Sequence, residues 1–294
     1  MRTLIPLPDT DFYLWQMLVQ IASGAVEDGV WLLYVTERPS ERLSALMDAQ
    51  IAEMHVWPDW RQPGGPTYNP AMKAGLVGQY LTAHPQAVDE PHLIIDPDVI
   101  PTGGRLPSGQ RGTLLGTDTD SYTGVDYLRS KGALDALCDL VGVSVEEVER
   151  WAPAIGSQYL TWGIPGEWWS EVERLSVPAY HLLLNLEVPT GQTPVQAWCA
   201  EMYVTHLMAV RDGYRPTAST DLSMVWAGDD VTGWDSSAFF HNAGVVEPNG
   251  RDFAKTEHQS SPWKSDIEVS EESASARYVE LIHDTAKKFP HLVW

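Results

Sequence analysis

The chain has 294 residues, 44% of them hydrophobic and 20% charged, so it is long enough to bury a substantial core as a globular protein. No apolar run approaches the roughly 20 residues that span a bilayer, and the proline- and acid-containing N-terminus does not look like a signal peptide. The net charge of −21 argues against a broad nucleic-acid-binding surface, which needs clustered Lys and Arg. Cys138 and Cys199 supply neither a disulfide framework nor a zinc spacing, so we predict a cytoplasmic protein that binds no membrane.

Predicted strands and helices alternate in the first part of the chain. The pattern predicts strands at residues 2–6, 30–36, 54–57 and 92–96, and helices that end at residue 23, cover 38–52 and begin at Asn69-Pro70. Because this alternation favours parallel strands, we predict an α/β fold with a Rossmann-type, mostly parallel sheet flanked by helices. Ligands of such sheets bind at the C-terminal ends of the strands.

The second part of the chain is less regular. Helix is predicted over 124–150, with a capped start at Ser144, and over 194–211 and 277–288, and short strands are predicted at 159–162 and 238–241. We find no repeat, low-complexity tract or linker in the sequence, so we predict a single domain.

Two acids stand at the end of the predicted strand at 92–96. Asp96 and Asp98 are one residue apart where the strand breaks before Pro101 and Gly103, so both carboxylates can turn toward one divalent cation. Hard ions such as Mg²⁺ or Mn²⁺ take carboxylate and phosphate oxygens and neutralise a departing diphosphate. This is the D-x-D arrangement of nucleotide-sugar glycosyltransferases, although Asp-Pro-Asp is also ordinary turn sequence.

The segments on either side of this acid pair contain no acids. Residues 60–88 and 99–117 lack Asp and Glu altogether. Their cations are Arg61, Lys73, Arg105 and Arg111. The local field suits a polyanion if these segments lie near the acids, whereas the alternative is two plain uncharged loops.

Three other side chains could carry chemistry. The predicted helix at 194–210 is apolar on nearly every side, and its one formal charge, Glu201, is either a catalytic group or a structural acid tied to Arg or Tyr. His241, at the end of a short strand, could complete a manganese site or be a core histidine. Lys255 could reach a diphosphate as a point charge or be a solvated surface lysine.

Six segments in the same order along the chain carry a family resemblance. They are Arg2–Leu4, Tyr13–Gln16, Tyr68 with Lys73, Ile95–Asp98, Pro153–Gly156 and Trp198–Tyr203. Together they resemble the plant-type peptidyl-serine α-galactosyltransferases and hydroxyproline O-arabinosyltransferases, which are GT-A-fold enzymes that use UDP-sugars. Where that family has Asn-Lys-Pro, this chain keeps only the lysine, Lys73.

The resemblance implies a metal-dependent, retaining glycosyltransferase that transfers a hexose or pentose within a GT-A-like fold. Residues 1–120 would form the nucleotide-sugar-binding half, and residues 121–294 would supply acceptor contacts and complete the metal site. Combined with the residue chemistry above, it predicts Mn²⁺ (or Mg²⁺) on Asp96, Asp98 and His241. It also predicts UDP-sugar contacts from Gln16, Lys73, Gly156 and Lys255, and a catalytic role for Glu201.

The sequence is compatible with several acceptors. A cytoplasmic enzyme does not meet hydroxyproline-rich cell walls, so we place first the hydroxyl of 5-hydroxymethylcytosine, or another hydroxymethylpyrimidine, in phage DNA, with the base flipped out. The net charge of −21 argues against a DNA acceptor, whereas the acid-free segments at 60–88 and 99–117 favour one. Alternatives are hydroxyproline or serine of a protein, or a small molecule. Alternatives of another class are an inactive nucleotide-sugar-binding module and an acidic interaction protein that mimics nucleic acid.

Overall fold

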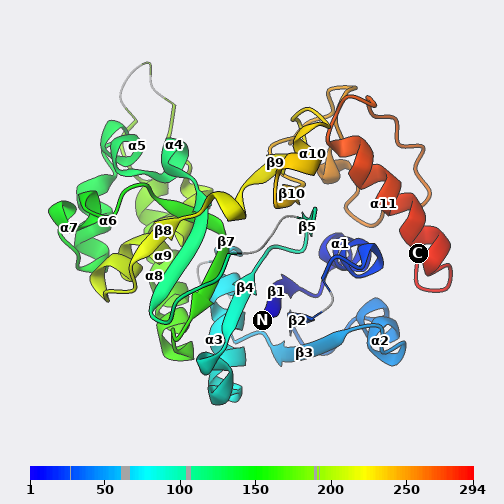
Figure 1. Cartoon of the computed structure of the whole chain (residues 1–294), viewed down its shortest axis with the longest axis horizontal. Coiled ribbons are helices and arrows are strands. Elements are labelled where there is room, and N and C mark those ends of the chain that lie inside the picture. The colour runs from blue at the N-terminus through cyan, green and yellow to red at the C-terminus, as the bar shows by residue number, and fades with distance from the viewer. Residues whose placement is uncertain (27, 61–66, 104–106, 189–190, 192) are drawn as a thin grey trace. The chain divides into compact units, whose positions relative to one another are not determined.

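The structure is a computed structural model that describes residues 1–26, 28–60, 67–103, 107–188, 191 and 193–294 (Figure 1). Two of the four cations in the acid-free segments, Arg61 and Arg105, lie outside the described residues, as does the Pro/Gly-rich loop at 63–66. No described helix combines the length and the apolar content that crossing a bilayer requires.

The strands of the described chain form two sheets. They are β1 (Arg2–Pro8), β2 (Gly29–Val35), β3 (Glu53–Pro58), β4 (Pro91–Ile94), β5 (Val99–Pro101), β6 (Thr113–Asp118), β7 (Ile155–Trp162), β8 (Pro216–Ala218), β9 (Met224–Trp226) and β10 (Phe239–His241). A seven-stranded sheet has the order β3-β2-β1-β4-β7-β6-β8, and a three-stranded sheet has the order β5-β10-β9 (Figure 1). In the larger sheet β1 with β4, β2 with β3 and β6 with β8 are parallel, while β7 is antiparallel to β4 and β6. The predicted α/β class with a mostly parallel sheet is confirmed.

The helices of the described chain range from single turns to 19 residues. The α-helices are α1 (Asp11–Ser23), α2 (Glu41–Asp48), α3 (Ala71–Ala83), α4 (Asp120–Thr123), α5 (Val125–Ser130), α6 (Leu134–Val141), α7 (Val145–Glu149), α8 (Gly166–Leu184), α9 (Ala200–Arg211), α10 (Gly233–Ser236) and α11 (Ser275–Lys288). The 3₁₀-helices are η1 (Pro85–Asp89), η2 (Ala197–Cys199), η3 (Thr220–Leu222) and η4 (Lys255–Glu257).

The chain divides into two compact units, each collected from three separated segments. Unit 1 consists of Met1–Pro6, Trp60–Ile94 and Ser108–Thr220. Unit 2 consists of Leu7–Asp59, Ile95–Pro107 and Asp221–Trp294. The functional halves predicted at 1–120 and 121–294 stay a prediction.

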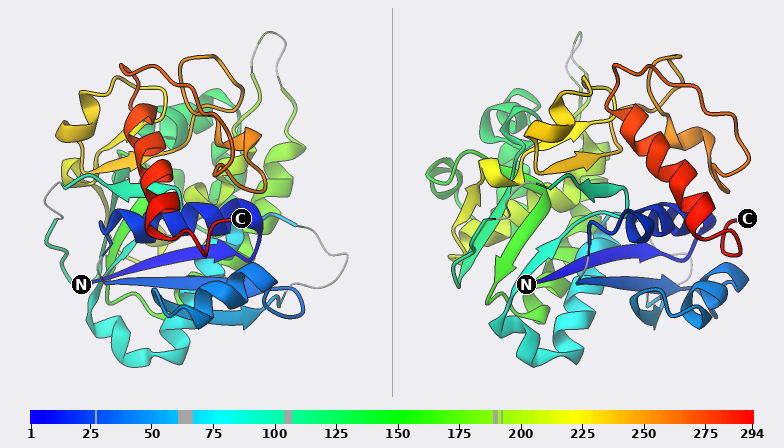
Figure 2. Two further views of the ribbon diagram at one scale, coloured as in Figure 1. Left: turned by 90° about the vertical axis from the view of Figure 1, so that its right-hand side faces the viewer. Right: turned by 45° about the vertical axis from the view of Figure 1, so that its right-hand side comes forward.

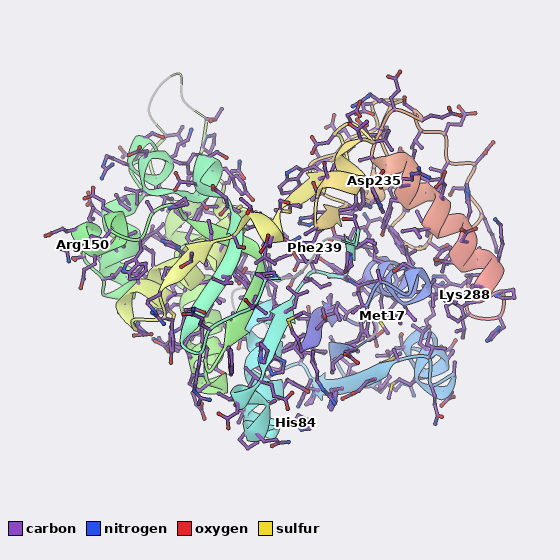
Figure 3. The ribbon with its side chains drawn as sticks, in the orientation of Figure 1. Met17, His84, Arg150, Asp235, Phe239 and Lys288 are labelled. Carbon is purple, nitrogen blue, oxygen red and sulfur yellow. The ribbon has the colours of Figure 1, made fainter. Side chains whose placement is uncertain are left out.

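In unit 2, helix α11 packs against α1, and the two views of Figure 2 show them side by side. Their shared core contains Trp15, Val19, Phe240, Tyr278 and Ile282. The Trp15 indole is fully buried and donates to the carbonyl of His258 at 2.9 Å, so its one polar atom is satisfied. Figure 3 shows Met17 of α1 and Lys288 at the end of α11 with their side chains. This core supports β10 and β5, the strands that carry the candidate site.

In unit 1, helices α3 and α8 approach closely where each carries a glycine. A Cβ on Gly78 would lie 2.6 Å from the Ser170 hydroxyl, and a Cβ on Gly166 would lie 2.6 Å from the carbonyl of Gly78. Only glycine fits at such a distance between two backbones. Helix α9 is buried along almost its whole length, as its all-round apolar sequence predicts.

Several predicted boundaries were wrong, and the causes are local. Helix α2 begins at Glu41 rather than at residue 38 because Ser40 caps it, accepting from the Leu43 amide at 3.1 Å, and it ends at Asp48 rather than at residue 52. The stretch 124–150 is three helices, separated at Gly132 and Gly142, whose φ angles are +67° and +80°. The predicted capped start at Ser144 is confirmed, because the Ser144 side chain accepts from the Glu147 amide at the start of α7. Helix α3 starts after Pro70 without a side-chain cap.

Other elements began later than expected or were not predicted at all. The helix expected from residue 194 begins as η2, and α9 itself starts at Ala200. The strand at 92–96 ends at Ile94, so both acids lie in the following turn. Strands β6, β8 and β9 were not predicted, nor was helix α8, whose pattern is interrupted by Pro178.

Candidate active site

The turn that carries Asp96 and Asp98 is held by a glutamine of α1. The Gln20 amide nitrogen donates to the carbonyls of Asp96 at 3.3 Å and Val99 at 2.8 Å. The Trp31 indole in turn donates to the Gln20 amide oxygen at 3.0 Å. Gln20 is fully buried, and sequence analysis missed it. A glutamine on the apolar face of a helix was the available signal, because a buried amide needs polar partners.

His241 reaches the acids through strand pairing. β10 runs antiparallel to β5, which places His241 opposite Val99, and the Asn242 amide donates to the Asp98 carbonyl at 3.0 Å. The His241 Nε2 atom lies 3.5 Å from the Asp98 Oδ1 atom. Trp226 stacks on the imidazole, with ring centroids 5.1 Å apart and planes 24° apart. The imidazole therefore faces the acid from a fixed strand position.

Asp96, Asp98 and His241 form a cluster with the donor atoms of a metal site. One ligand atom from each lies within 4.8 Å of the others. Two carboxylates and an imidazole suit Mn²⁺, which accepts both donor types, better than Mg²⁺, which prefers oxygen alone. The predicted grouping of these three residues is confirmed by their proximity, and their role as ligands stays a prediction.

Asp98 is a buried acid, only 4% exposed, that carries a negative charge. Burial alone would raise its pKa, but the Lys255 ammonium, which donates to Oδ2, and the adjacent His241 hold the pKa of Asp98 well below its usual range. Near these acids, burial and then the charges of Asp98 and Asp96 raise the pKa of Tyr13 to about 12. At neutral pH the turn therefore offers an ionised carboxylate beside a neutral phenol.

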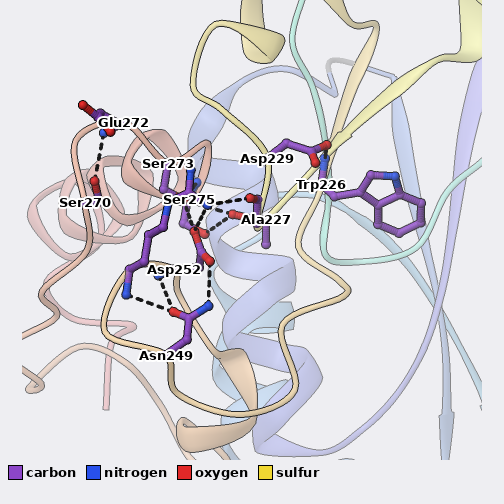
Figure 4. A network of polar contacts seen from close by, with 11 residues as sticks. Trp226, Ala227, Asp229, Asn249, Asp252, Ser270, Glu272, Ser273 and Ser275 are labelled. Carbon is purple, nitrogen blue, oxygen red and sulfur yellow. Dashed lines mark hydrogen bonds and ion pairs between the residues drawn. The ribbon is translucent and has the colours of Figure 1, made fainter.

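Lys255 follows a second buried acid, Asp252, whose contacts hold the loop in place. Figure 4 shows Asp252 with its partners Asn249 and Ser273. Asp252 accepts from Asn249 Nδ2 at 2.7 Å and from the Ser273 hydroxyl at 2.6 Å. Ser275, the first residue of α11, donates to the Ala227 carbonyl at 2.7 Å, and the Ser273 hydroxyl oxygen lies 3.1 Å from the same carbonyl. The loop is thus fastened to α11 and to the residue after β9, which fixes the backbone from which Lys255 extends.

Glu201 belongs to unit 1 and is paired with Lys73. The acid is 2% exposed, and Lys73 Nζ lies 3.4 Å from its Oε2 atom. The Thr205 hydroxyl, one turn along α9, donates to Oε1 at 3.1 Å. The Glu201 amide donates to Tyr68 Oη at 3.0 Å, and that hydroxyl donates to the Trp198 carbonyl at 2.5 Å. The expected partner was Arg or Tyr, and the ion-pair partner is instead a lysine.

Gly156 and Gln16, the two remaining residues predicted to contact the UDP-sugar, are closely packed against their neighbours. A Cβ on Gly156 in β7 would lie 2.0 Å from the Met202 methyl carbon and 3.1 Å from the Thr119 hydroxyl, so the Met202 side chain fills the space that glycine leaves. Gln16 is fully buried, and its amide donates to the Phe12 carbonyl at 2.5 Å within α1. Donor binding by Gly156 and Gln16 stays a prediction. Gln16, Asp96, Asp98, His241 and Lys255 belong to unit 2, whereas Lys73, Gly156 and Glu201 belong to unit 1.

No family model matches this sequence, and no curated protein matches it. Among solved structures, the chain is similar to galactosyltransferase LgtC in complex with donor and acceptor sugar analogues, at a TM-score of 0.46 and 11% identity over 100% of both chains. It is similar to an active-site mutant of LgtC at a TM-score of 0.49 and 12% identity, covering 96% of this chain and 95% of LgtC. It is also similar to the glycosyltransferase GlyE of Streptococcus pneumoniae TIGR4, at a TM-score of 0.48 and 12% identity, and it spans only 64% of that chain. Similarity this low establishes neither fold nor activity.

Proposed function

We propose that this protein is a metal-dependent glycosyltransferase that moves a sugar from a UDP-sugar to a hydroxyl group. The observation that carries the proposal is the cluster of Asp96, Asp98 and His241, whose ligand atoms lie within 4.8 Å of one another, with Lys255 donating to Asp98. A divalent cation beside a lysine is suited to binding a nucleoside diphosphate and to stabilising it as a leaving group. The resemblance to the plant enzymes adds retention of the anomeric configuration.

Each residue of the cluster has a distinct task in this proposal. Asp96, Asp98 and His241 would hold the cation, which when bound supplies Lewis acidity to the diphosphate oxygens. Trp226, stacked on the imidazole at 5.1 Å, keeps His241 in its orientation. Lys255 would bind the diphosphate as a point charge.

Glu201 is proposed to act on the sugar or on the acceptor. A buried carboxylate can orient the acceptor hydroxyl, accept its proton, or stabilise positive charge on the sugar as the bond to the diphosphate breaks. The Lys73 ammonium, 3.4 Å away, stabilises the negative charge that these roles require. Lys73, Gly156 and Gln16 are proposed donor contacts on the resemblance alone.

For the acceptor, we propose first the hydroxyl of 5-hydroxymethylcytosine in phage DNA. The acid-free segments of the sequence support it. The described cations of those segments support it less, because Arg111 pairs with Asp89 at 2.5 Å and Lys73 pairs with Glu201. A hydroxyproline or serine of a protein, or a small molecule, is the alternative acceptor, and a nucleotide-sugar-binding module without turnover is the alternative of another class.

One assay separates these possibilities. The protein is incubated with a panel of UDP-sugars and Mn²⁺, and UDP release is measured together with the mass of a DNA duplex that contains 5-hydroxymethylcytosine. The same duplex with cytosine and a sample with chelator are the controls. A sugar-sized mass increase on the modified duplex alone supports the DNA acceptor. UDP release without that increase points to another hydroxyl.

Calorimetry covers the remaining outcomes. UDP binding without turnover on any acceptor identifies the binding module. Failure to bind either UDP or Mn²⁺ refutes the proposed function altogether.

A further inference from the structure

Both carboxylate oxygens of Asp98 already face a positive or proton-donating group. Lys255 donates to Oδ2, and the His241 imidazole lies 3.5 Å from Oδ1. The Asp98 side chain is 6% exposed, and that of Lys255 is 21% exposed. The lysine therefore neutralises a buried acid that the proposed function gives to a cation.

A divalent cation and the Lys255 ammonium compete for this carboxylate. A cation on Asp96, Asp98 and His241 would set two further positive charges against an ammonium that donates to the same group. Repulsion between charges so close is strong in a buried site, where water screens poorly. Binding of the cation therefore requires Lys255 to leave Asp98.

The backbone at Lys255 limits where the ammonium can go. Asp252 and Ser273 fasten the loop before it, and the His258 amide donates to the Lys255 carbonyl at 3.0 Å, so the backbone is held on both sides. The lysine side chain rotates freely at four bonds, so it can move without the loop moving. An ammonium released from Asp98 needs a new anion, and a diphosphate bound to the same cation supplies one.

We propose that Lys255 couples binding of the divalent cation to binding of the diphosphate, by pairing with Asp98 in the free protein and with the diphosphate in the loaded one. The inference rests on the proposed function. Each ligand then removes part of the cost of binding the other, and this coupling is reciprocal. The cation alone binds weakly, because it must displace Lys255 without compensation, and UDP strengthens its binding.

The test is a Mn²⁺ titration that follows the electron paramagnetic resonance of the free ion, with and without UDP, and the Mn²⁺ that UDP binds in a titration without protein is subtracted. In the wild-type protein we expect UDP to raise the Mn²⁺ affinity by about tenfold or more, a typical coupling. In Lys255→Met we expect tighter Mn²⁺ binding without UDP and a loss of most of the enhancement. Lys255→Arg keeps a cation beside Asp98 and should keep the coupling. Lys264→Met, at an exposed lysine, is the matched control.

The outcomes separate this inference from the proposed function. No Mn²⁺ binding with or without UDP overturns both. Mn²⁺ binding that UDP leaves unchanged in the wild-type protein overturns the coupling alone, and this measurement does not depend on any variant folding. The coupling is equally overturned if Lys255→Met binds Mn²⁺ like the wild type and keeps the full UDP enhancement.

Discussion

Each unit contains a buried acid paired with a lysine, and the two pairs differ in what else surrounds the acid. Asp98 faces Lys255 together with a second carboxylate and an imidazole whose ligand atoms lie within 4.8 Å. Glu201 faces Lys73 and the hydroxyl of Thr205, a neutral group that adds no negative charge for a cation. Within the described residues, Glu201 belongs to no cluster of three acid, histidine or cysteine ligands.

The difference shows that burial and a lysine partner do not by themselves mark a metal site. A buried ion pair is costly to break wherever it lies, because one charge is left without a partner. A cation site additionally needs several donors that converge, and strand pairing supplies them around Asp98. The two pairs should therefore respond differently to substitution.

Asp98→Asn is expected to have the largest effect. The amide has no negative charge for a cation, so turnover should fall by about a thousandfold or more and Mn²⁺ binding should be lost. Folding should be retained, because Lys255 is partly exposed and can turn to water. Activity and Mn²⁺ titrations check this, with Asp284→Asn on the exposed face of α11 as control. Wild-type turnover in Asp98→Asn would remove the metal assignment.

Glu201→Gln is expected to affect stability and turnover but not Mn²⁺ affinity. Lys73, whose side chain is 12% exposed, keeps its charge and loses the Glu201 carboxylate, so the free energy of unfolding should fall by about 3 kcal/mol. Turnover should fall by about a hundredfold if Glu201 acts on the sugar or the acceptor. Urea unfolding, turnover and Mn²⁺ titration are measured together. Weakened Mn²⁺ binding, as severe as in Asp98→Asn, would erase the distinction between the two pairs.

A pH titration probes the same helix through His206. Burial lowers the pKa of His206 from 6.5 to about 4, so the unfolded chain takes up a proton in a range where the folded protein does not. The stability that depends on neutral His206 is present above pH 6.5 and is lost as the pH falls toward 4. The loss should reach about 3 kcal/mol. In His206→Gln the free energy of unfolding should not show this loss at low pH. If the variant and the wild-type protein lose stability alike between pH 6.5 and 4, His206 is not the group responsible.

Thr205→Val should have the smallest effect. It removes the hydroxyl that donates to Glu201 Oε1 at 3.1 Å while keeping the shape of the side chain, so we expect a loss of about 1 kcal/mol of stability. Turnover should fall less than in Glu201→Gln, because the Lys73 pair remains. A variant as damaged as Glu201→Gln would mean that the hydroxyl, rather than the lysine, holds the acid.

The candidate site could be predicted from sequence only where its parts are close along the chain. Asp96 and Asp98 stand two residues apart after an apolar strand, and that spacing was sufficient to propose a shared cation. His241 and Lys255 were identified by residue type. The sequence alone could not distinguish a metal ligand from a core histidine at 241, or a diphosphate contact from a solvated surface lysine at 255. Gln20, which holds the turn, was signalled only by its place on the apolar face of a helix. Asp252, which holds the Lys255 loop, carries no pattern that distinguishes it from other polar residues.

For this protein, the periodicity of apolar residues determined the α/β class, the mostly parallel sheet and the burial of α9, because these follow from local spacing. Only the tertiary structure decided that His241 meets Asp98, that Lys255 neutralises it, and that Lys73 rather than Arg or Tyr pairs with Glu201. Those contacts depend on the register of β10 against β5 and on the packing of segments that are distant along the chain. Because the free energy of the whole fold selects such contacts, no local periodicity in the sequence predicts them.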